Sequence, residues 1–205
     1  GNLWRERVPA ALAVLNGFGK FAGSTQIDEL GELETPVLLT NTLATGRAIE
    51  AIIAHTLAQH GNERVVSVNA VVGETNDSRL NDIRAARPTV AEMREALICA
   101  RGGAVAEGGV GAGTGTVAFG LKGGIGTASR CVDDLGMLGV LVQTNYGGSL
   151  RIDGKPMPPQ DARADVDGSI VIVIATDAPL SSRNLGRLAE RAFAGLARTG
   201  SALSN

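Results

Sequence analysis

The amino-acid sequence predicts a layered α/β or α+β sandwich in a single domain over residues 1–205. Apolar runs over residues 65–72, 138–144 and 170–175 do not alternate with polar residues, which is typical of strands covered on both faces. Other segments repeat their apolar residues at helical spacing, which predicts helices packed on those strands. With 44% hydrophobic and 20% charged residues, the chain can bury a core.

The first half of the chain contains four predicted elements. These are a strand or buried segment over residues 8–16, a strand over 36–40, a helix over 48–60 and a strand over 65–72. Ile49, Ile52 and Ile53 lie on one side of the predicted helix, and Gly61 is well placed to end it.

The second half begins with a helix over residues 90–101, because Thr89 and Glu92 have the spacing of a capping box. A glycine-rich stretch follows over 102–126, then a strand over 138–144 and a polar surface loop over 151–167. The strongest strand signal covers 170–175. The last helix covers 182–198, and its inward face is expected to consist of Leu185, Leu188, Ala192, Phe193 and Leu196.

Composition excludes several classes of function. A net charge of −2 and six aromatic residues argue against nucleic acid as a partner. The apolar run over 170–175 is far shorter than the roughly 20 residues that span a membrane, so no membrane association is expected. No signal-peptide pattern is visible, and two cysteines fit a reducing compartment, so we expect a cytoplasmic protein.

Histidine chemistry is also unexpected. His55 and His60 are the only histidines, and their five-residue spacing in one predicted helix places them on different faces. The sequence therefore predicts neither a metal site, nor a Ser-His-Asp triad, nor any cofactor.

The glycine-rich segment over residues 107–130 contains nine glycines in 24 residues. It lacks the G-K-[ST] ending of a phosphate-binding loop and no strong strand precedes it, so nucleotide binding is disfavoured. The alternation of Gly111, Gly113 and Gly115 suits a strand under close backbone approach. We interpret this segment as a tight turn or a ligand-lining wall.

Four polar positions are candidates for chemistry. Ser169 follows Gly168 between an acidic loop and the apolar run, where cleavage of the Gly168–Ser169 bond would free a serine α-amine as a catalytic base. Asn145 ends a strand and could stabilise an oxyanion. Glu74 follows another strand and could hold a substrate ammonium, with Glu107 as the second candidate. Ordinary turn residues are the alternative at each position.

Five stretches of the chain resemble the L-aminopeptidase/D-esterase and β-peptidyl aminopeptidase family. They are LETPVLLTNT, VVGETND with LND, the glycine-rich segment over 107–130, LVQTN, and DGSIVIVIATDAPL. The resemblance implies an αββα sandwich like that of N-terminal nucleophile hydrolases, with different connectivity. It implies cleavage between Gly168 and Ser169 into an α-chain part, residues 1–168, and the start of a β chain, residues 169–205.

The same resemblance assigns roles. Ser169 matches the nucleophile, Asn145 the oxyanion-stabilising residue, and Asn76 a position where some relatives carry an active-site tyrosine. A related acetyltransferase family uses threonine as nucleophile, which Ser169 argues against. The resemblance implies small peptide, amide or ester substrates, homo-oligomers that are commonly tetramers, and a chain that is part of a longer family member. The alternative is a non-catalytic α/β domain that uses the glycine-rich wall to bind a small ligand or partner.

Overall fold

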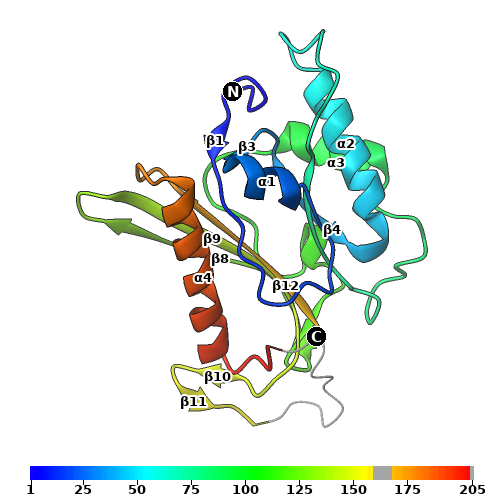
Figure 1. Ribbon diagram of the computed structural model, residues 1–205. Coiled ribbons are helices and arrows are strands. Elements are labelled where there is room, and N and C mark those ends of the chain that lie inside the picture. The colour runs from blue at the N-terminus through cyan, green and yellow to red at the C-terminus, as the bar shows by residue number, and fades with distance from the viewer. Residues whose placement is uncertain (159–167, 204–205) are drawn as a thin grey trace.

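The structure is a computed structural model that describes residues 1–158 and 168–203 (Figure 1). Two three-stranded sheets form the centre of this part of the chain. One sheet has the order β2-β5-β4, with bounds Phe21–Ala22, Val71–Thr75 and Val37–Asn41. The other has the order β12-β9-β8, with bounds Ser169–Thr176, Gly136–Asn145 and Gly124–Val132. β4 and β5 run parallel, whereas all pairs in the second sheet are antiparallel.

Helices form the two outer layers. α2 (Thr45–Leu57) packs on β4 and β5, and α3 (Val90–Cys99) packs on α2. α4 (Ser182–Arg198) lies beside the second sheet (Figure 1). The layers thus follow the αββα order that was predicted. Among the described residues, no helix has the length and hydropathy needed to cross a membrane.

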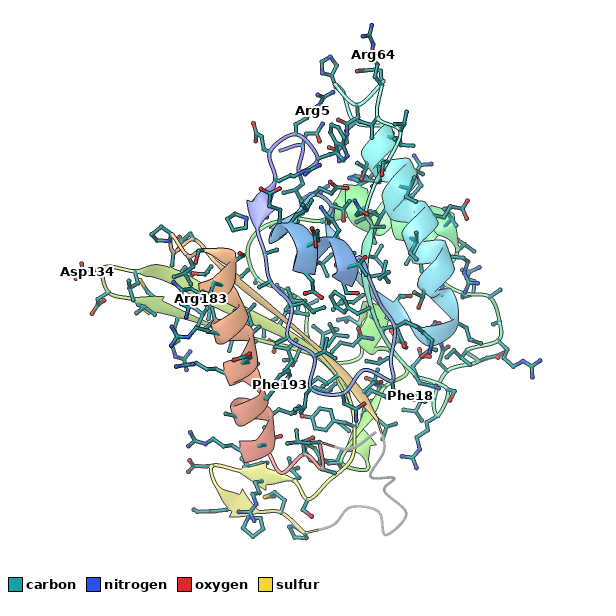
Figure 2. All side chains as sticks on the ribbon, viewed as in Figure 1. Arg5, Phe18, Arg64, Asp134, Arg183 and Phe193 are labelled. Carbon is teal, nitrogen blue, oxygen red and sulfur yellow. The ribbon has the colours of Figure 1, made fainter. Side chains whose placement is uncertain are left out.

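The remaining elements are short. They are β1 (Val8–Pro9), α1 (Ser24–Leu30), β3 (Glu32–Leu33), β6 (Val117–Ala118), β7 (Leu121–Lys122), β10 (Arg151–Ile152), β11 (Lys155–Pro156) and two 3₁₀ turns, η1 (Thr42–Ala44) and η2 (Gly111–Gly113). β8 and β9 extend beyond β12 as an arm, with Asp134 at its tip (Figure 2).

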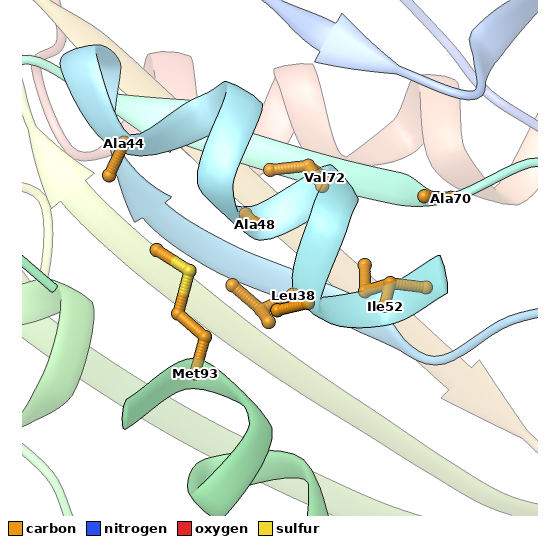
Figure 3. Close-up of a cluster of buried hydrophobic side chains, with 8 residues drawn as sticks. Leu38, Ala44, Ala48, Ile52, Ala70, Val72 and Met93 are labelled. Carbon is orange, nitrogen blue, oxygen red and sulfur yellow. The ribbon is translucent and has the colours of Figure 1, made fainter. Parts of the chain in front are cut away.

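The main core lies between α2 and the first sheet (Figure 3). Ala48, Ala51 and Ile52 are completely buried, and their helical spacing places them on one face of α2. The alanines allow α2 to lie close to Leu38 of β4 and Val72 of β5. Strand alternation then directs the neighbouring residues of β4 and β5 toward the second sheet.

A buried amide joins the two sheets. Gln143 of β9 is completely buried, and its Nε2 donates to the Thr40 carbonyl at 3.1 Å and the Thr75 hydroxyl at 2.7 Å. The same nitrogen donates to the Ala112 carbonyl of η2 at 3.2 Å. One side chain therefore links β9 to β4, to β5 and to the glycine-rich segment.

Next to this amide, Gly73 of β5 faces Val171 of β12. A Cβ at position 73 would lie 2.9 Å from Val171 Cγ1 and 3.1 Å from Leu39 Cδ2. Because Val171 is itself buried, the sheets approach each other closely only with glycine at this position.

Most of the predicted elements are confirmed. The strands over 36–40, 138–144 and 170–175 correspond to β4, β9 and β12, and the last helix has the bounds that were expected. The capping box is present: the Thr89 hydroxyl accepts from the Glu92 N–H, and the Glu92 carboxylate accepts from the Thr89 N–H. The helix it begins ends at Cys99, two residues early.

Two predicted boundaries are wrong because side chains satisfy the backbone there. Residues 65–70 do not form strand; the Asn69 N–H donates to Glu34 Oε1 at 2.8 Å, and β5 begins only at Val71. α2 ends at Leu57 and not before Gly61, and the Asn62 amide donates to the Thr56 carbonyl at 2.7 Å.

Three further expectations need correction. Of residues 8–16, only Val8 and Pro9 pair as strand, and Val14 is 61% exposed. The residues Gly111–Gly113 form a 3₁₀ turn, so the alternating glycines do not lie in a strand. Residues 151–156 form the β10–β11 hairpin, while residues 159–167 of the predicted surface loop lie outside the described part of the chain.

We predict that Gly73→Ala lowers the free energy of unfolding by about 1–3 kcal/mol, because the added methyl group overpacks the contact with Val171. Val171 is β-branched and buried, so it cannot turn away cheaply. Gly46→Ala is the matched control, because a Cβ there meets nothing within 4 Å in α2. That variant should gain about 0.5–1 kcal/mol. Urea unfolding measures both, and equal stabilities would contradict the prediction.

Candidate active site

Ser169 begins β12 and lies directly opposite Asn145, the last residue of β9. Both side chains are on the face of the sheet that includes Val171 and Gln143, which is the face toward the first sheet. The Ser169 Oγ accepts from the backbone N–H of Asn76, the residue after β5, at 3.4 Å. Thus the ends of β5, β9 and β12 meet at one place.

Both ends of the Asn145 amide are engaged. Its Nδ2 donates to the Asn76 carbonyl at 2.8 Å, and its Oδ1 accepts from the Val117 N–H at 3.1 Å. The orientation of the amide follows from these two partners, since only the nitrogen can donate to a carbonyl. Asn145 therefore holds the turn after β5 and the β6–β7 hairpin at the Ser169 end of the sheet.

Asn76 contributes its backbone rather than its side chain. Its N–H points to the Ser169 Oγ and its carbonyl binds Asn145, whereas its own Oδ1 accepts from the Ser78 N–H at 3.1 Å. The side chain thus stabilises the turn and the residue as a whole is exposed. The sequence predicted Asn76 as a site residue, but the role of its backbone depends on the fold and was not predicted.

Gly168 has no room for a side chain. A Cβ at this position would lie 2.3 Å from the Asn145 carbonyl oxygen and 2.4 Å from Tyr146 Cα. Any side chain at position 168 would therefore clash with the backbone at the end of β9. The acidic residues Asp165 and Asp167, noted in the sequence, lie outside the described residues.

Glu74 is a buried carboxylate near the end of β5. Its side chain is 3% exposed, and its Oε1 accepts from the Lys20 N–H at 2.9 Å and lies 3.8 Å from the Lys20 Nζ. The Thr42 hydroxyl donates to its other oxygen. Phe18, two residues before Lys20, is 78% exposed (Figure 2). Strand alternation places Glu74 on the same face of β5 as Val72, whereas Gly73 and Thr75 face the second sheet. The carboxylate is therefore two residues from Asn76 in sequence and is held by Lys20 and Thr42.

The structure does not bring Glu107 together with Ser169. The carboxylate of Glu107 accepts from the N–H of Thr127 at 2.8 Å and from the Thr127 hydroxyl, and these bonds lower its pKa. Thr127 pairs with Leu141, which pairs with Val173, four residues along β12 from Ser169. At about 3.3 Å per residue, Val173 lies roughly 13 Å along β12 from Ser169, and Thr127 lies two strands away from β12, so it is farther still.

Asp77, which directly follows Asn76, was not predicted from the sequence. Asp77 is 5% exposed; its Oδ2 accepts from Asn81 Nδ2 at 2.9 Å, while its buried Oδ1 has no hydrogen-bond partner among the described residues. Burial raises the pKa of this carboxyl above its ordinary value, although the Asn81 hydrogen bond partly opposes the shift. An acidic residue in a turn gives no sequence signal of burial, so only the fold identifies it.

Neither histidines nor metal ligands gather near Ser169. Among the described residues, no group of three or more His, Cys, Asp or Glu side chains could hold a metal ion. The arrangement instead offers a hydroxyl, a backbone N–H and a side-chain amide at one site. These are the groups that a nucleophile and an oxyanion require.

Comparisons with known proteins agree on one family. The model of peptidase family S58 matches residues 1–205. A β-peptidyl aminopeptidase, BapA of Sphingosinicella xenopeptidilytica, is 40% identical over 217 residues, covering 95% of this chain and 54% of the relative. The chain therefore spans about half the length of this curated relative.

Solved structures show the same similarity. The PH0078 protein of Pyrococcus horikoshii OT3 has a TM-score of 0.89 and 43% identity, over 98% of this chain and 59% of its own. The L-aminopeptidase D-Ala-esterase/amidase of Ochrobactrum anthropi has a TM-score of 0.83 and 36% identity, over 96% of this chain and 57% of its own. The latter is described as a prototype serine aminopeptidase with a new variant of the Ntn hydrolase fold.

We predict that Asp77→Asn changes how stability depends on pH. A raised pKa in the folded state means that stability is fully present at low pH and is lost as pH rises through that pKa. The variant lacks this loss, so its free energy of unfolding relative to the wild type should increase with pH across the acidic range. Urea unfolding at several pH values measures this difference. The exposed Asp28→Asn variant controls for loss of one charge, and a pH-independent difference for Asp77→Asn would refute the prediction.

Proposed function

Because the chain belongs to peptidase family S58, we propose that its protein is a self-processing serine aminopeptidase or amidase. It would release N-terminal residues from small peptides, amides or esters. The observation that carries the proposal is the meeting of Ser169 with Asn145 and the Asn76 N–H beside the tightly packed Gly168. The comparisons with serine and β-peptidyl aminopeptidases do not favour the non-catalytic alternative.

Self-processing would use the same hydroxyl as catalysis. The Ser169 Oγ attacks the Gly168 carbonyl carbon, the peptide bond breaks, and the nitrogen leaves as the α-amine of Ser169. Water then hydrolyses the ester, so that Gly168 ends one chain and Ser169 begins the other. The close packing of the Gly168 backbone against the end of β9 supports this step, because it limits how far the reacting groups can move apart.

In the mature protein the freed α-amine would act as the general base. It accepts the Oγ proton when neutral, which fits an α-amino pKa of about 7.7–8.0. The oxyanion that forms on the substrate needs donors in place. Asn145 Nδ2 carries two hydrogens, and the bond to the Asn76 carbonyl uses one of them. The other hydrogen supports a role for Asn145 as an oxyanion donor.

Glu74 would bind the substrate ammonium. It is a buried carboxylate two residues before Asn76, and the Lys20 Nζ at 3.8 Å, a cation beside this carboxylate, supports the role. We also propose that cleavage divides the chain into residues 1–168 and 169–205. The protein would be a cytoplasmic homo-oligomer, and the family resemblance favours a tetramer. The exposed edge of β8 and the exposed Leu135 and Met137 of the arm support contact between copies.

We predict that Ser169→Ala abolishes both chain cleavage and hydrolysis, because one hydroxyl serves both reactions. Intact mass spectrometry reports the cleavage, and p-nitroanilides of L-, D- and β-amino acids report the hydrolysis. Ser129→Ala, at an exposed position of β8, is the matched control and should keep both activities. Hydrolysis at the wild-type rate by Ser169→Ala would remove this residue from the mechanism.

We predict that Glu74→Gln raises the KM for free-amine substrates, because it keeps the shape of the side chain and removes its charge. Loss of a charge-assisted hydrogen bond should reduce kcat/KM roughly 10-fold or more. Esters and amides whose amine is acetylated should be poor substrates of the wild type and should be affected little by the substitution. Glu107→Gln serves as the control, since it removes a carboxylate that is bound at Thr127. If Glu107→Gln, and not Glu74→Gln, lowers the preference for free-amine over acetylated substrates, Glu107 binds the substrate ammonium and the prediction is wrong.

A further inference from the structure

The Lys122 ammonium lies among three backbone carbonyl groups of the glycine-rich segment. It donates to the carbonyl oxygens of Gly113 and Gly123, both at 2.7 Å, and to that of Thr116 at 3.2 Å. An ammonium group has three N–H donors, so these acceptors match its full hydrogen-bonding capacity. No ion pair joins Lys122 to a carboxylate within the described residues, and burial of the ammonium lowers its pKa.

We propose that Lys122 is a positioning residue, a built-in cation that holds the glycine-rich segment in the shape that orients Asn145. This inference rests on the proposed function for its effect on catalysis. The structural part of the proposal is that the Lys122 ammonium fills a site formed by three carbonyl groups. This part can be tested without measuring hydrolysis.

The hairpin supplies the first link between Lys122 and Asn145. Lys122 in β7 pairs with Val117 in β6, and the Gly123 N–H donates to the Thr116 carbonyl at 2.9 Å. The carbonyl of Thr116 belongs to the same peptide group as the Val117 N–H. Lys122 binds the same carbonyl at 3.2 Å, so together with the Gly123 N–H it fixes the direction in which the Val117 N–H points, toward Asn145 Oδ1 at 3.1 Å.

The second link runs from Asn145 to the reacting serine. Asn145 Nδ2 holds the Asn76 carbonyl, and the Asn76 N–H lies on the Ser169 Oγ. A change in the direction of the Val117 N–H would therefore rotate the Asn145 amide. The rotation would move the Nδ2 hydrogen that is proposed to face the oxyanion. A displacement of about 1 Å at such a donor can cost up to roughly 100-fold in rate.

Electrostatics gives a reason for a cation at this position. Three carbonyl oxygens that converge on one point repel each other. Besides Lys122, the Thr116 hydroxyl donates to the Gly113 carbonyl at 3.1 Å and the Gly123 N–H donates to the Thr116 carbonyl, but neither of these donors carries a positive charge. A hydroxyl or an amide nitrogen could satisfy one or two of the oxygens. A lysine ammonium satisfies three and adds a positive charge. Without it the segment should open, and the Val117 N–H should lose its fixed direction.

The test compares Lys122→Ala with Lys155→Ala, an exposed lysine of β11 that serves as the control. We expect Lys122→Ala to lower kcat about 10- to 100-fold with KM changed less than about 2-fold, since substrate binding is not the step affected. Hydrogen exchange at the Val117 amide should become faster. Ammonium or methylammonium chloride at constant ionic strength should restore both readings in part, because these ions can donate to the empty carbonyl site. Tetramethylammonium has the same charge and no N–H, so it should restore neither.

Each outcome decides the matter. Equal effects of tetramethylammonium and methylammonium, or unchanged exchange at Val117, would overturn the proposal. A fall in kcat that vanishes in Lys122→Met, which keeps the apolar stem and has no ammonium, would overturn it as well. Lys122→Met also shows by its unfolding temperature whether loss of the charge alone prevents folding. If the wild type neither cleaves itself nor hydrolyses any substrate, the proposed function fails, and the exchange measurement alone still decides whether Lys122 holds the segment.

Discussion

The Ser169 site depends on the close approach of the two sheets at Gly73 and Val171. The close contact is possible because Gly73 has no side chain against Val171, and the buried Gln143 amide fixes how the sheets are aligned. A buried amide with its donors satisfied is a directional link, whereas apolar contacts alone would allow the sheets to slide. The alignment in turn sets where the turn after β5 meets the ends of β9 and β12.

The site is assembled from backbone as much as from side chains. The Asn76 N–H and carbonyl come from the turn after β5, and the Val117 N–H comes from β6, both far from Ser169 in sequence. The Asn145 side chain bonds to both of these segments. In the proposed mechanism, orientation comes from these fixed amides and the base would come from the nucleophile's own amine, so no histidine is required.

How far the sequence predicts this structure depends on the range of the interactions. The strand over 170–175, the last helix and the capping box at Thr89 follow from local pattern, and they are confirmed. The strand prediction for residues 65–70 is wrong, and the distant Glu34 carboxylate binds the Asn69 N–H there. Ser169 and Asn145 were chosen at strand ends, which antiparallel pairing brings together, whereas Asn76 came from the family resemblance. The burial of Asp77 and the carbonyl site of Lys122 depend on tertiary contacts that no local pattern encodes.

The ladder between β9 and β12 carries a consequence for a protein cut at Ser169. Eight residue pairs join β12 to β9, and Val171 inserts against Gly73. After cleavage these contacts, with those of the residues that follow β12, such as Asp177 at the Met137 N–H and Gly200 at the Ser149 N–H, would help to keep the two pieces together as a heterodimer. Its assembly from unfolded pieces would then be bimolecular and would depend on concentration, although folding of the uncut chain would not. The cut would therefore make the protein harder to rebuild once it has come apart.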